Sequence, residues 1–281
     1  GDRPHLPDLI CWPETVEEVS RVVRLSNRHR VPIVPYGGGS GVCGAAIPTH
    51  GGIILDMKRM KKVESITEGL PFPTAVVQTG IIGQHLEEQL NQKGWTLGHF
   101  PSSIMCSTLG GYIACRAAGQ MSSKYGKIEE MVEEIEVVLP SGDLLPLGRP
   151  LRNFPGVRTK DLFVGTEGCL GIITRARLRV HPLPPTTLYR GLSFNRLSDG
   201  LTAVREILQA GLRPSVIRLY DPLDSLLLQY GLEGSAGGGV LALFKGFLKQ
   251  ARQFLAGNPD WIQRFLALLP SNPLLILGFE G

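Results

Sequence analysis

The chain has 281 residues, of which 43% are apolar and 19% are charged, so it is long enough to bury one large core or two ordinary ones. Its 29 Lys and Arg residues nearly balance its 25 Asp and Glu residues, and the net charge of +4 is spread along the chain without a basic run. These values argue against a nucleic-acid partner.

The five cysteines are widely spaced and lack the gap of two to four residues that is typical of zinc-ligand pairs. They are Cys11, Cys43, Cys106, Cys115 and Cys169. We therefore predict reduced thiols and no metal site. Since no apolar run reaches the roughly 18 residues of a membrane span and the first residues do not resemble a signal peptide, we expect a cytoplasmic protein or one that docks on a membrane surface.

Hydrophobic periodicity predicts the elements of the first part of the chain. The first is a helix from Pro13 to Arg30, in which Thr15 and Glu18 have capping-box spacing. The elements expected after it are strands at Val31–Pro35, Ile53–Leu55 and Ala75–Gln78, a helix at Gly83–Lys93 with Gly94 as a left-handed cap, a hairpin of Val132–Leu139 with Leu144–Leu147, and a strand at Gly171–Val180.

The segment His181-Pro182-Leu183-Pro184-Pro185 is expected to be a linker, because three prolines in five residues stop helices and central strands. Beyond it, a second unit is expected. Its elements are a strand at Leu188–Phe194, a helix at Ser198–Ala210 capped by Ser198, a strand at Ser215–Tyr220, and one or two amphipathic helices at Val240–Leu269.

Three glycine-rich or small-residue segments indicate a large, extended ligand. Gly39-Ser40-Gly41-Val42-Cys43-Gly44 has the glycine spacing of a dinucleotide fingerprint, but Pro48 and two further glycines follow where a helix should begin. We therefore interpret it as a loop whose backbone N–H groups form an anion-binding nest. The other two segments are Pro101–Gly111, which is rich in hydroxyls, and Gly165–Gly171, which places Glu167 among three glycines.

Four motifs occur in one order along the chain. They are Pro35-Tyr36-Gly37-Gly38-Gly39-Ser40-Gly41, Pro101-Ser102-Ser103 with Ser107-Thr108-Leu109-Gly110-Gly111, Arg116-Ala117-Ala118-Gly119 with Tyr125-Gly126, and Gly165-Thr166-Glu167-Gly168 with Leu170-Gly171-Ile172-Ile173-Thr174. In this order and spacing they resemble the FAD-contact motifs of the vanillyl-alcohol oxidase / p-cresol methylhydroxylase family. The resemblance is close from about Pro7 to Leu183 and looser beyond.

The resemblance implies an α+β fold, with a two-subdomain FAD-binding domain of p-cresol methylhydroxylase type at residues 1–183 and a partial α/β cap, or substrate, domain at residues 187–281. It also implies roles for the motifs. The first loop and Ser102–Thr108 would hold the pyrophosphate, Cys115–Ala118 would run beside the flavin, and Glu167–Ile173 would bind the adenosine half. The cofactor-binding residues implied are Pro35, Tyr36, Gly37, Gly38, Gly39, Ser40, Gly41, Pro101, Ser102, Ser103, Ser107, Thr108, Gly110, Gly111, Cys115, Arg116, Ala117, Ala118, Gly119, Tyr125, Gly126, Glu167, Gly168, Gly171, Ile172 and Ile173.

Some members of the family attach FAD through a histidine at the position that Gly39 occupies here. We therefore expect non-covalent FAD, while a tether from Cys106 or Cys115 stays open. Arg218 is the residue expected to bind a substrate anion, since a guanidinium can clamp a carboxylate or phosphate bidentately. The sparse histidines His85, His99 and His181 are expected to be structural.

Three functions compete. The first expectation is an FAD-linked oxidoreductase that transfers hydride from a 2-hydroxy acid or related hydroxylated substrate to flavin N5. The alternative is an enzyme similar to the alkyldihydroxyacetonephosphate synthases of ether-lipid synthesis, which Arg116-Ala117-Ala118-Gly119 resembles and whose flavin serves a redox-neutral exchange of an acyl for an alkyl group. The third is an FAD-binding fragment or electron-carrying subunit.

Further expectations concern completeness and partners. Longer family members carry catalytic histidine and tyrosine side chains beyond the position that matches Gly281, so we expect this chain to be catalytically incomplete. The sequence leaves open whether the protein has an electron-acceptor partner and whether it forms a homodimer. The amphipathic stretch Leu241–Leu269 could contact a membrane surface, but a cap-domain helix is the favoured interpretation.

Overall fold

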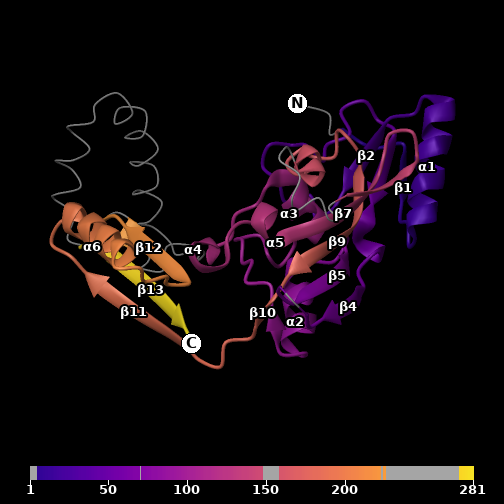
Figure 1. Cartoon of the computed structure of the whole chain (residues 1–281). Coiled ribbons are helices and arrows are strands. Elements are labelled where there is room, and N and C mark those ends of the chain that lie inside the picture. The colour runs from indigo at the N-terminus through magenta and orange to yellow at the C-terminus, as the bar shows by residue number, and fades with distance from the viewer. Residues whose placement is uncertain (1–4, 70, 148–157, 223, 226–271) are drawn as a thin grey trace, which may run out of the picture. The chain divides into compact units, whose positions relative to one another are not determined.

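The computed structural model describes residues 5–69, 71–147, 158–222, 224–225 and 272–281. The chain divides into two compact units, Gly1–Pro185 and Thr186–Gly281, and both mix helices with strands (Figure 1). The division falls at the end of the proline-rich segment that the sequence marks as a linker.

The first unit begins with a small parallel sheet in the order β1-β3-β2. Its strands are β1 (Leu9–Cys11), β3 (Ile53–Asp56) and β2 (Ile33–Tyr36), and helix α1 (Val16–His29) packs beside them through Val19 and Val23 (Figure 1). The Thr15 side chain accepts a hydrogen bond from the N–H of Glu18, which satisfies one free donor at the start of α1. The predicted cap by Thr15 is confirmed, but the capping box is incomplete, because the Glu18 carboxylate accepts from the N–H of Glu14 and not from that of Thr15.

A five-stranded antiparallel sheet in the order β4-β5-β9-β7-β8 forms the larger part of this unit. The strands are β4 (Val63–Thr67), β5 (Thr74–Gln78), β9 (Ile172–Arg179), β7 (Val132–Val138) and β8 (Leu144–Leu147). On one face, apolar residues of the sheet pack with α2 (Gly83–Asn91), α3 (Leu109–Cys115) and α5 (Ile128–Met131) into the main core. On the other face, cross-strand ion pairs join β9 to β7, among them Arg177 with Glu134 and Arg179 with Glu133.

Short elements complete the first unit. They are the 3₁₀ helices η1 (Met57–Arg59) and η2 (Thr159–Leu162), the single-turn helix α4 (Ser122–Tyr125), and the two-residue strands β6 (Trp95–Thr96) and β10 (His181–Pro182), which pair with each other. The start of the predicted linker therefore belongs to the first unit.

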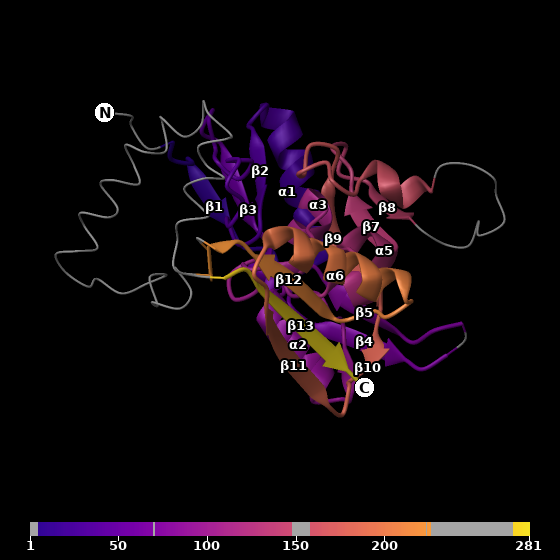
Figure 2. The same cartoon turned by 90° about the vertical axis from the view of Figure 1, so that its left-hand side faces the viewer.

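The second unit contains an antiparallel sheet in the order β11-β13-β12. Its elements are β11 (Thr187–Ser193), α6 (Leu197–Gln209), β12 (Val216–Tyr220) and β13 (Leu274–Glu280). Figure 2 shows α6 lying across this sheet, and a Cβ at Gly200 of α6 would approach the Leu219 side chain of β12 to 2.8 Å. A small residue on the helix therefore allows this close packing.

Most predicted elements are present, with small shifts at their ends. The predicted capping of α6 by Ser198 is wrong. The N-cap residue is Arg196, which forms no side-chain cap, and the Ser198 hydroxyl contacts Asp199. Strands β1, β4 and β13 were not predicted. The amphipathic segment Val240–Leu269 lies outside the described residues, and in the part of the chain that is described no helix is long and apolar enough to cross a membrane.

Candidate functional site

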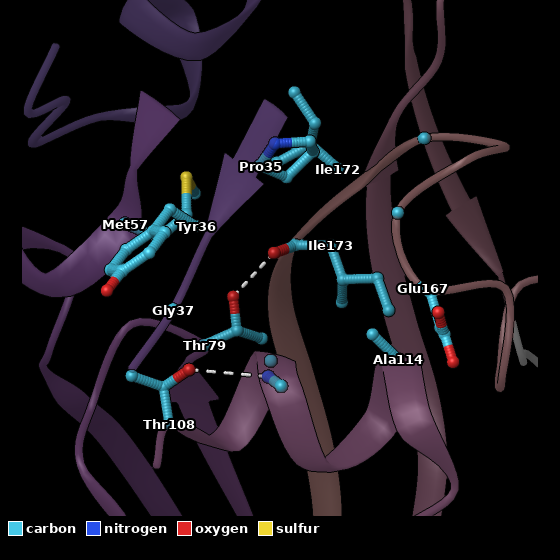
Figure 3. Close-up of a pocket in the computed structure, with 14 residues that line it drawn as sticks. Pro35, Tyr36, Gly37, Met57, Thr79, Thr108, Ala114, Glu167, Ile172 and Ile173 are labelled. Carbon is cyan, nitrogen blue, oxygen red and sulfur yellow. Dashed lines mark hydrogen bonds between the residues drawn. The ribbon is translucent and has the colours of Figure 1, made fainter. Parts of the chain in front are cut away.

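A cleft in the first unit collects residues from five separate parts of the chain. Figure 3 shows Tyr36 and Met57 on one side of it, Glu167 on the other, and Thr79 and Thr108 beside helix α3. The lining residues are Pro35, Tyr36, Gly37, Met57, Thr79, Thr108, Gly110, Gly111, Ala114, Glu167, Gly168, Gly171, Ile172 and Ile173.

The glycine-rich loop that follows β2 has no helix at its start, as the sequence analysis predicted. Gly39 has φ = 64°, in the left-handed region that favours glycine. Within the described residues, none of the N–H groups of residues 37 to 41 donates to a protein acceptor. These unused donors in an irregular loop form a surface that suits an anion.

Gly38 serves the packing of this loop. A Cβ at this position would lie 1.9 Å from the carbonyl oxygen of Cys106, so only glycine allows the loop to contact the backbone of Cys106 and Ser107. At Gly37, a Cβ would lie 2.3 Å from Oγ1 of Thr108. The first two glycine-rich segments of the sequence are therefore in direct contact.

Threonines fix the part of the cleft that α3 forms. The Thr108 side chain caps α3 by accepting from the N–H of Gly111 at 3.3 Å (Figure 3). Thr79 is buried and donates through Oγ1 to the carbonyl oxygen of Ile173 at 2.5 Å, while its own carbonyl accepts from the N–H of Gly110 at 2.7 Å. Thr79 thus joins β9 to the start of α3.

Glu167 lies at the other side of the cleft with its carboxylate exposed. Its φ of 53° is unusual for a residue other than glycine, and its N–H donates to the carbonyl of Ala114 in α3 at 3.0 Å. Gly168 follows with φ = 86° and packs against Pro35. The backbone at Glu167 is therefore strained, and this conformation presents the free carboxylate to the cleft.

The cleft brings together eleven of the residues that the sequence analysis names for the cofactor. They are Pro35, Tyr36, Gly37, Thr108, Gly110, Gly111, Glu167, Gly168, Gly171, Ile172 and Ile173. Met57, Thr79 and Ala114 also line it and were not predicted. Thr79 directly follows β5, and only the pairing of β5 with β9 places it here, so no local sequence signal could have identified it.

The other named residues do not line the cleft, and several of them have structural contacts. Arg116 has φ = 50°, ends α3, and donates through Nε to the carbonyl of Val164. The Ser107 hydroxyl, which is buried, bonds to Tyr112 and Ser103, and the Tyr125 ring packs against the His181 ring at a tilt of 55°. The rest are Gly38, Gly39, Ser40, Gly41, Pro101, Ser102, Ser103, Cys115, Ala117, Ala118, Gly119 and Gly126.

Partial burial raises the pKa of the Cys115 thiol, and the nearby negative charge of Glu167 adds to this effect. A raised pKa keeps the sulfur protonated and weakly nucleophilic. Among the described residues, no group of three or more His, Cys, Asp or Glu side chains could hold a metal ion.

His99 lies behind α3 and is 2% exposed. Its ring meets Tyr112 edge to face at 4.8 Å between centroids, and neither ring nitrogen has a hydrogen-bond partner. Burial lowers the pKa of His99 to about 4, so the ring is neutral at pH 7. Its neighbour Glu87 is also buried and accepts from Thr96 and from the N–H groups of Leu97 and Gly98, while burial raises the pKa of that carboxyl.

Arg218 lies in the second unit, in β12, where it pairs with Ile276 of β13. Its guanidinium is exposed and stands 5.6 Å from the centre of the Tyr220 ring. Its role at a substrate stays a prediction.

Comparison with known proteins gives a consistent result. A family model described as FAD binding domain matches residues 7–148. An alkyldihydroxyacetonephosphate synthase of Dictyostelium discoideum is 37% identical over all of this chain and 44% of its own length, and the glycolate oxidase subunit GlcD of Bacillus subtilis is 34% identical over 80% of this chain and 47% of its own length. A solved structure of an alkyldihydroxyacetonephosphate synthase has a TM-score of 0.76 and 35% identity, covering 97% of this chain and 46% of that one. The chain therefore spans about half the length of the relatives it matches.

Proposed function

Because the chain belongs to the FAD binding domain family, we propose that its cleft binds FAD and that it is the FAD-binding part of an alkyldihydroxyacetonephosphate synthase-like enzyme. The observation that carries the proposal is the similarity to two such synthases along all of this chain, at 37% and 35% identity. The second unit is included in this similarity. By the same resemblance, we propose that the first unit is an FAD-binding domain of p-cresol methylhydroxylase type with two subdomains, and that the second unit is part of a cap domain.

The residues present fit FAD. The N–H groups of residues 37 to 41 are free to donate to a diphosphate, and no lysine or arginine is required for that contact. The cleft wall carries no side chains at Gly37, Gly110 and Gly111, so a flat ligand can approach the backbone there. The exposed carboxylate of Glu167 can accept hydrogen bonds from ribose hydroxyls.

When bound, FAD supplies the electron-accepting ring system, while the protein supplies its position and surroundings. In this chain, the caps and cross-links made by Thr79 and Thr108 hold α3 against β9. They keep the cleft walls at a fixed separation. Thr79 is buried, which also keeps water from this contact.

We propose that FAD is bound without a covalent bond. Gly39 offers no side chain for a tether, and the raised pKa of Cys115 disfavours the thiolate that a cysteine tether would need. The tether from Cys115 that the sequence leaves open is therefore the weaker alternative.

A second candidate is the oxidation of a 2-hydroxy acid, which the sequence analysis placed first. The similarity to the glycolate oxidase subunit supports it, but that similarity covers 80% of the chain, against all of it for the synthases. For this reason the synthase-like function now takes precedence.

The experiment that separates these functions adds substrates to the FAD-loaded chain. With a fatty alcohol and acyl-dihydroxyacetone phosphate, we expect no net bleaching of the flavin absorbance, and alkyl product only slowly or not at all, because this chain is expected to be catalytically incomplete. With D-lactate or glycolate, we expect no bleaching. Bleaching by a hydroxy acid, without alkyl product from the first pair, would contradict the synthase-like function and favour the second candidate.

A further inference from the structure

Lys58 holds a fixed ammonium group beside the glycine-rich loop. It lies in η1, directly after β3, and its Nζ is 3.2 Å from the carbonyl oxygen of Gly37 and 2.9 Å from Oδ2 of Asp56. The same nitrogen stands 4.8 Å from the centre of the Tyr36 ring. Three different acceptors therefore surround one lysine at the end of β2.

Asp56 keeps this lysine in place. Its carboxylate accepts from the backbone N–H of Lys58 at 3.1 Å and from the indole N–H of Trp12 at 3.1 Å, in addition to the Lys58 ammonium. The Asp56 side chain is only 10% exposed, whereas that of Lys58 is 37% exposed. An ion pair with a buried, fully bonded carboxylate is held more firmly than an exposed pair on a surface.

The contact with Gly37 determines how one peptide of the loop is oriented. The bond between Gly37 and Gly38 is planar and trans, so its C=O and N–H point to opposite sides. Between two glycines this peptide could rotate easily, because neither residue restricts φ and ψ. The bond from Lys58 selects the orientation in which the Gly37 carbonyl faces the lysine and the Gly38 N–H faces away from it, where it donates to no described residue.

We propose that Lys58 is a positioning residue for FAD: it fixes the Gly37–Gly38 peptide so that its N–H is ready for the diphosphate, and it adds one positive charge beside the loop. This inference rests on the FAD binding proposed above. The Lys58 ammonium offsets the repulsion that the Asp56 carboxylate would otherwise exert on an anion at the loop. A fixed peptide also avoids the cost of ordering it when the ligand binds.

The test is an equilibrium titration with FAD, followed by flavin fluorescence, at low and at high salt. Lys58→Met removes the charge and the donor, Lys58→Arg keeps both, and Lys61→Met is the control, since Lys61 is exposed and forms no contact with the loop. We expect Lys58→Met to raise the Kd for FAD about tenfold and to weaken its salt dependence, as fits the loss of a charge-assisted hydrogen bond. Lys58→Arg should recover most of the affinity, and Lys61→Met should bind as the wild type does.

A second variant separates this role from stability. Lys58→Met leaves Asp56 without its cation. The double variant Lys58→Met, Asp56→Asn removes the leftover charge and keeps one acceptor oxygen, so it should recover part of the thermal midpoint of the apoprotein but not the affinity for FAD. Two results would overturn this inference alone. One is a wild-type Kd for FAD in Lys58→Met, and the other is a double variant that recovers its affinity for FAD together with its stability. A wild-type chain that does not bind FAD would overturn both this inference and the proposed function.

Discussion

Gly111 is the residue at which folding and cofactor binding can be separated most cleanly. It lines the cleft from within α3, and a Cβ there would meet only Oγ1 of Thr108, at an ordinary 3.5 Å. Gly111→Ala should therefore leave the apoprotein as stable as the wild type or more stable by roughly 0.5 to 1 kcal/mol, because alanine favours a helix. The added methyl group occupies the cleft, so the affinity for FAD should fall; titration and denaturant unfolding measure the two effects.

The matched control is Gly69→Ala, which also adds one methyl group but lies in the turn between β4 and β5, away from the cleft lining. Unchanged FAD binding in Gly111→Ala would show that the ligand does not contact this wall. Gly38 is a poor choice for such a test, because its replacement would disrupt the contact with Cys106 whether or not FAD binds there.

His99 makes the stability of the first unit depend on pH. Its folded pKa of about 4 lies below the ordinary 6.5, so the folded state binds the proton less readily than the unfolded chain. Its contribution is complete above pH 6.5 and is lost as the pH falls towards 4, by on the order of 3 kcal/mol in the free energy of unfolding. Denaturant unfolding at pH 7, 5.5 and 4.5 measures this loss, which should shrink in His99→Leu.

Two neighbours must be considered in that measurement. The raised pKa of Glu87 acts in the opposite direction, and the lowered pKa of His181 acts in the same direction as that of His99. The difference between wild type and His99→Leu isolates His99, with the exposed His85→Gln as control. Equal pH dependence in wild type and His99→Leu would show that His99 is not buried as a neutral ring.

The sequence predicted part of the candidate site and missed residues whose role arises only from packing. The glycines and Glu167 could be named because their types and order match family motifs. Thr79 and Met57 could not be named. Each directly follows a strand whose sequence is ordinary, and its place at the cleft depends on the pairing of β5 with β9 and of β3 with β2. For the same reason the contact of Gly38 with Cys106, which is 68 residues away, left no local signal.

At the scale of elements, the cap of α1 permits a direct test. The Thr15 hydroxyl accepts from the N–H of Glu18, so Thr15→Ala should destabilise the protein by about 1 kcal/mol. Thr15→Ser keeps the hydroxyl and should retain most of the stability. Chemical denaturation measures both variants, and equal loss in the two would show that the cap bond is not the cause.

Helices and strands with strong periodicity were predicted well, and weak or polar ones were not. In α1, Val19 and Val23 recur on one buried face, and the sequence shows this directly. Strand β4 has the sequence Val-Glu-Ser-Ile-Thr, pairs with only one neighbour, and is buried at none of its positions, so its pattern does not differ from that of a loop. Ser198 has the usual chemistry of a cap, but α6 begins earlier, at Leu197.

At the scale of the whole molecule, the two units and the cleft follow from different kinds of evidence. The proline-rich segment that ends at Pro185 marked the division from composition alone. The three glycine-rich segments indicated one large ligand, and the family resemblance indicated which part of it each segment would bind. That residues 35 and 173 line one cleft could not be predicted locally, because they lie in two different sheets and meet only through tertiary packing. The central claim is that this chain, through that cleft, binds FAD without a covalent bond.

The most direct test of this claim loads the chain with FAD, removes free flavin on a desalting column, and measures flavin absorbance before and after acid precipitation. We expect one flavin per chain in the loaded protein and, after precipitation, a colourless pellet with all of the flavin in the supernatant. If the desalted protein carries no flavin, the chain does not bind FAD. If the pellet is yellow, the bond to FAD is covalent.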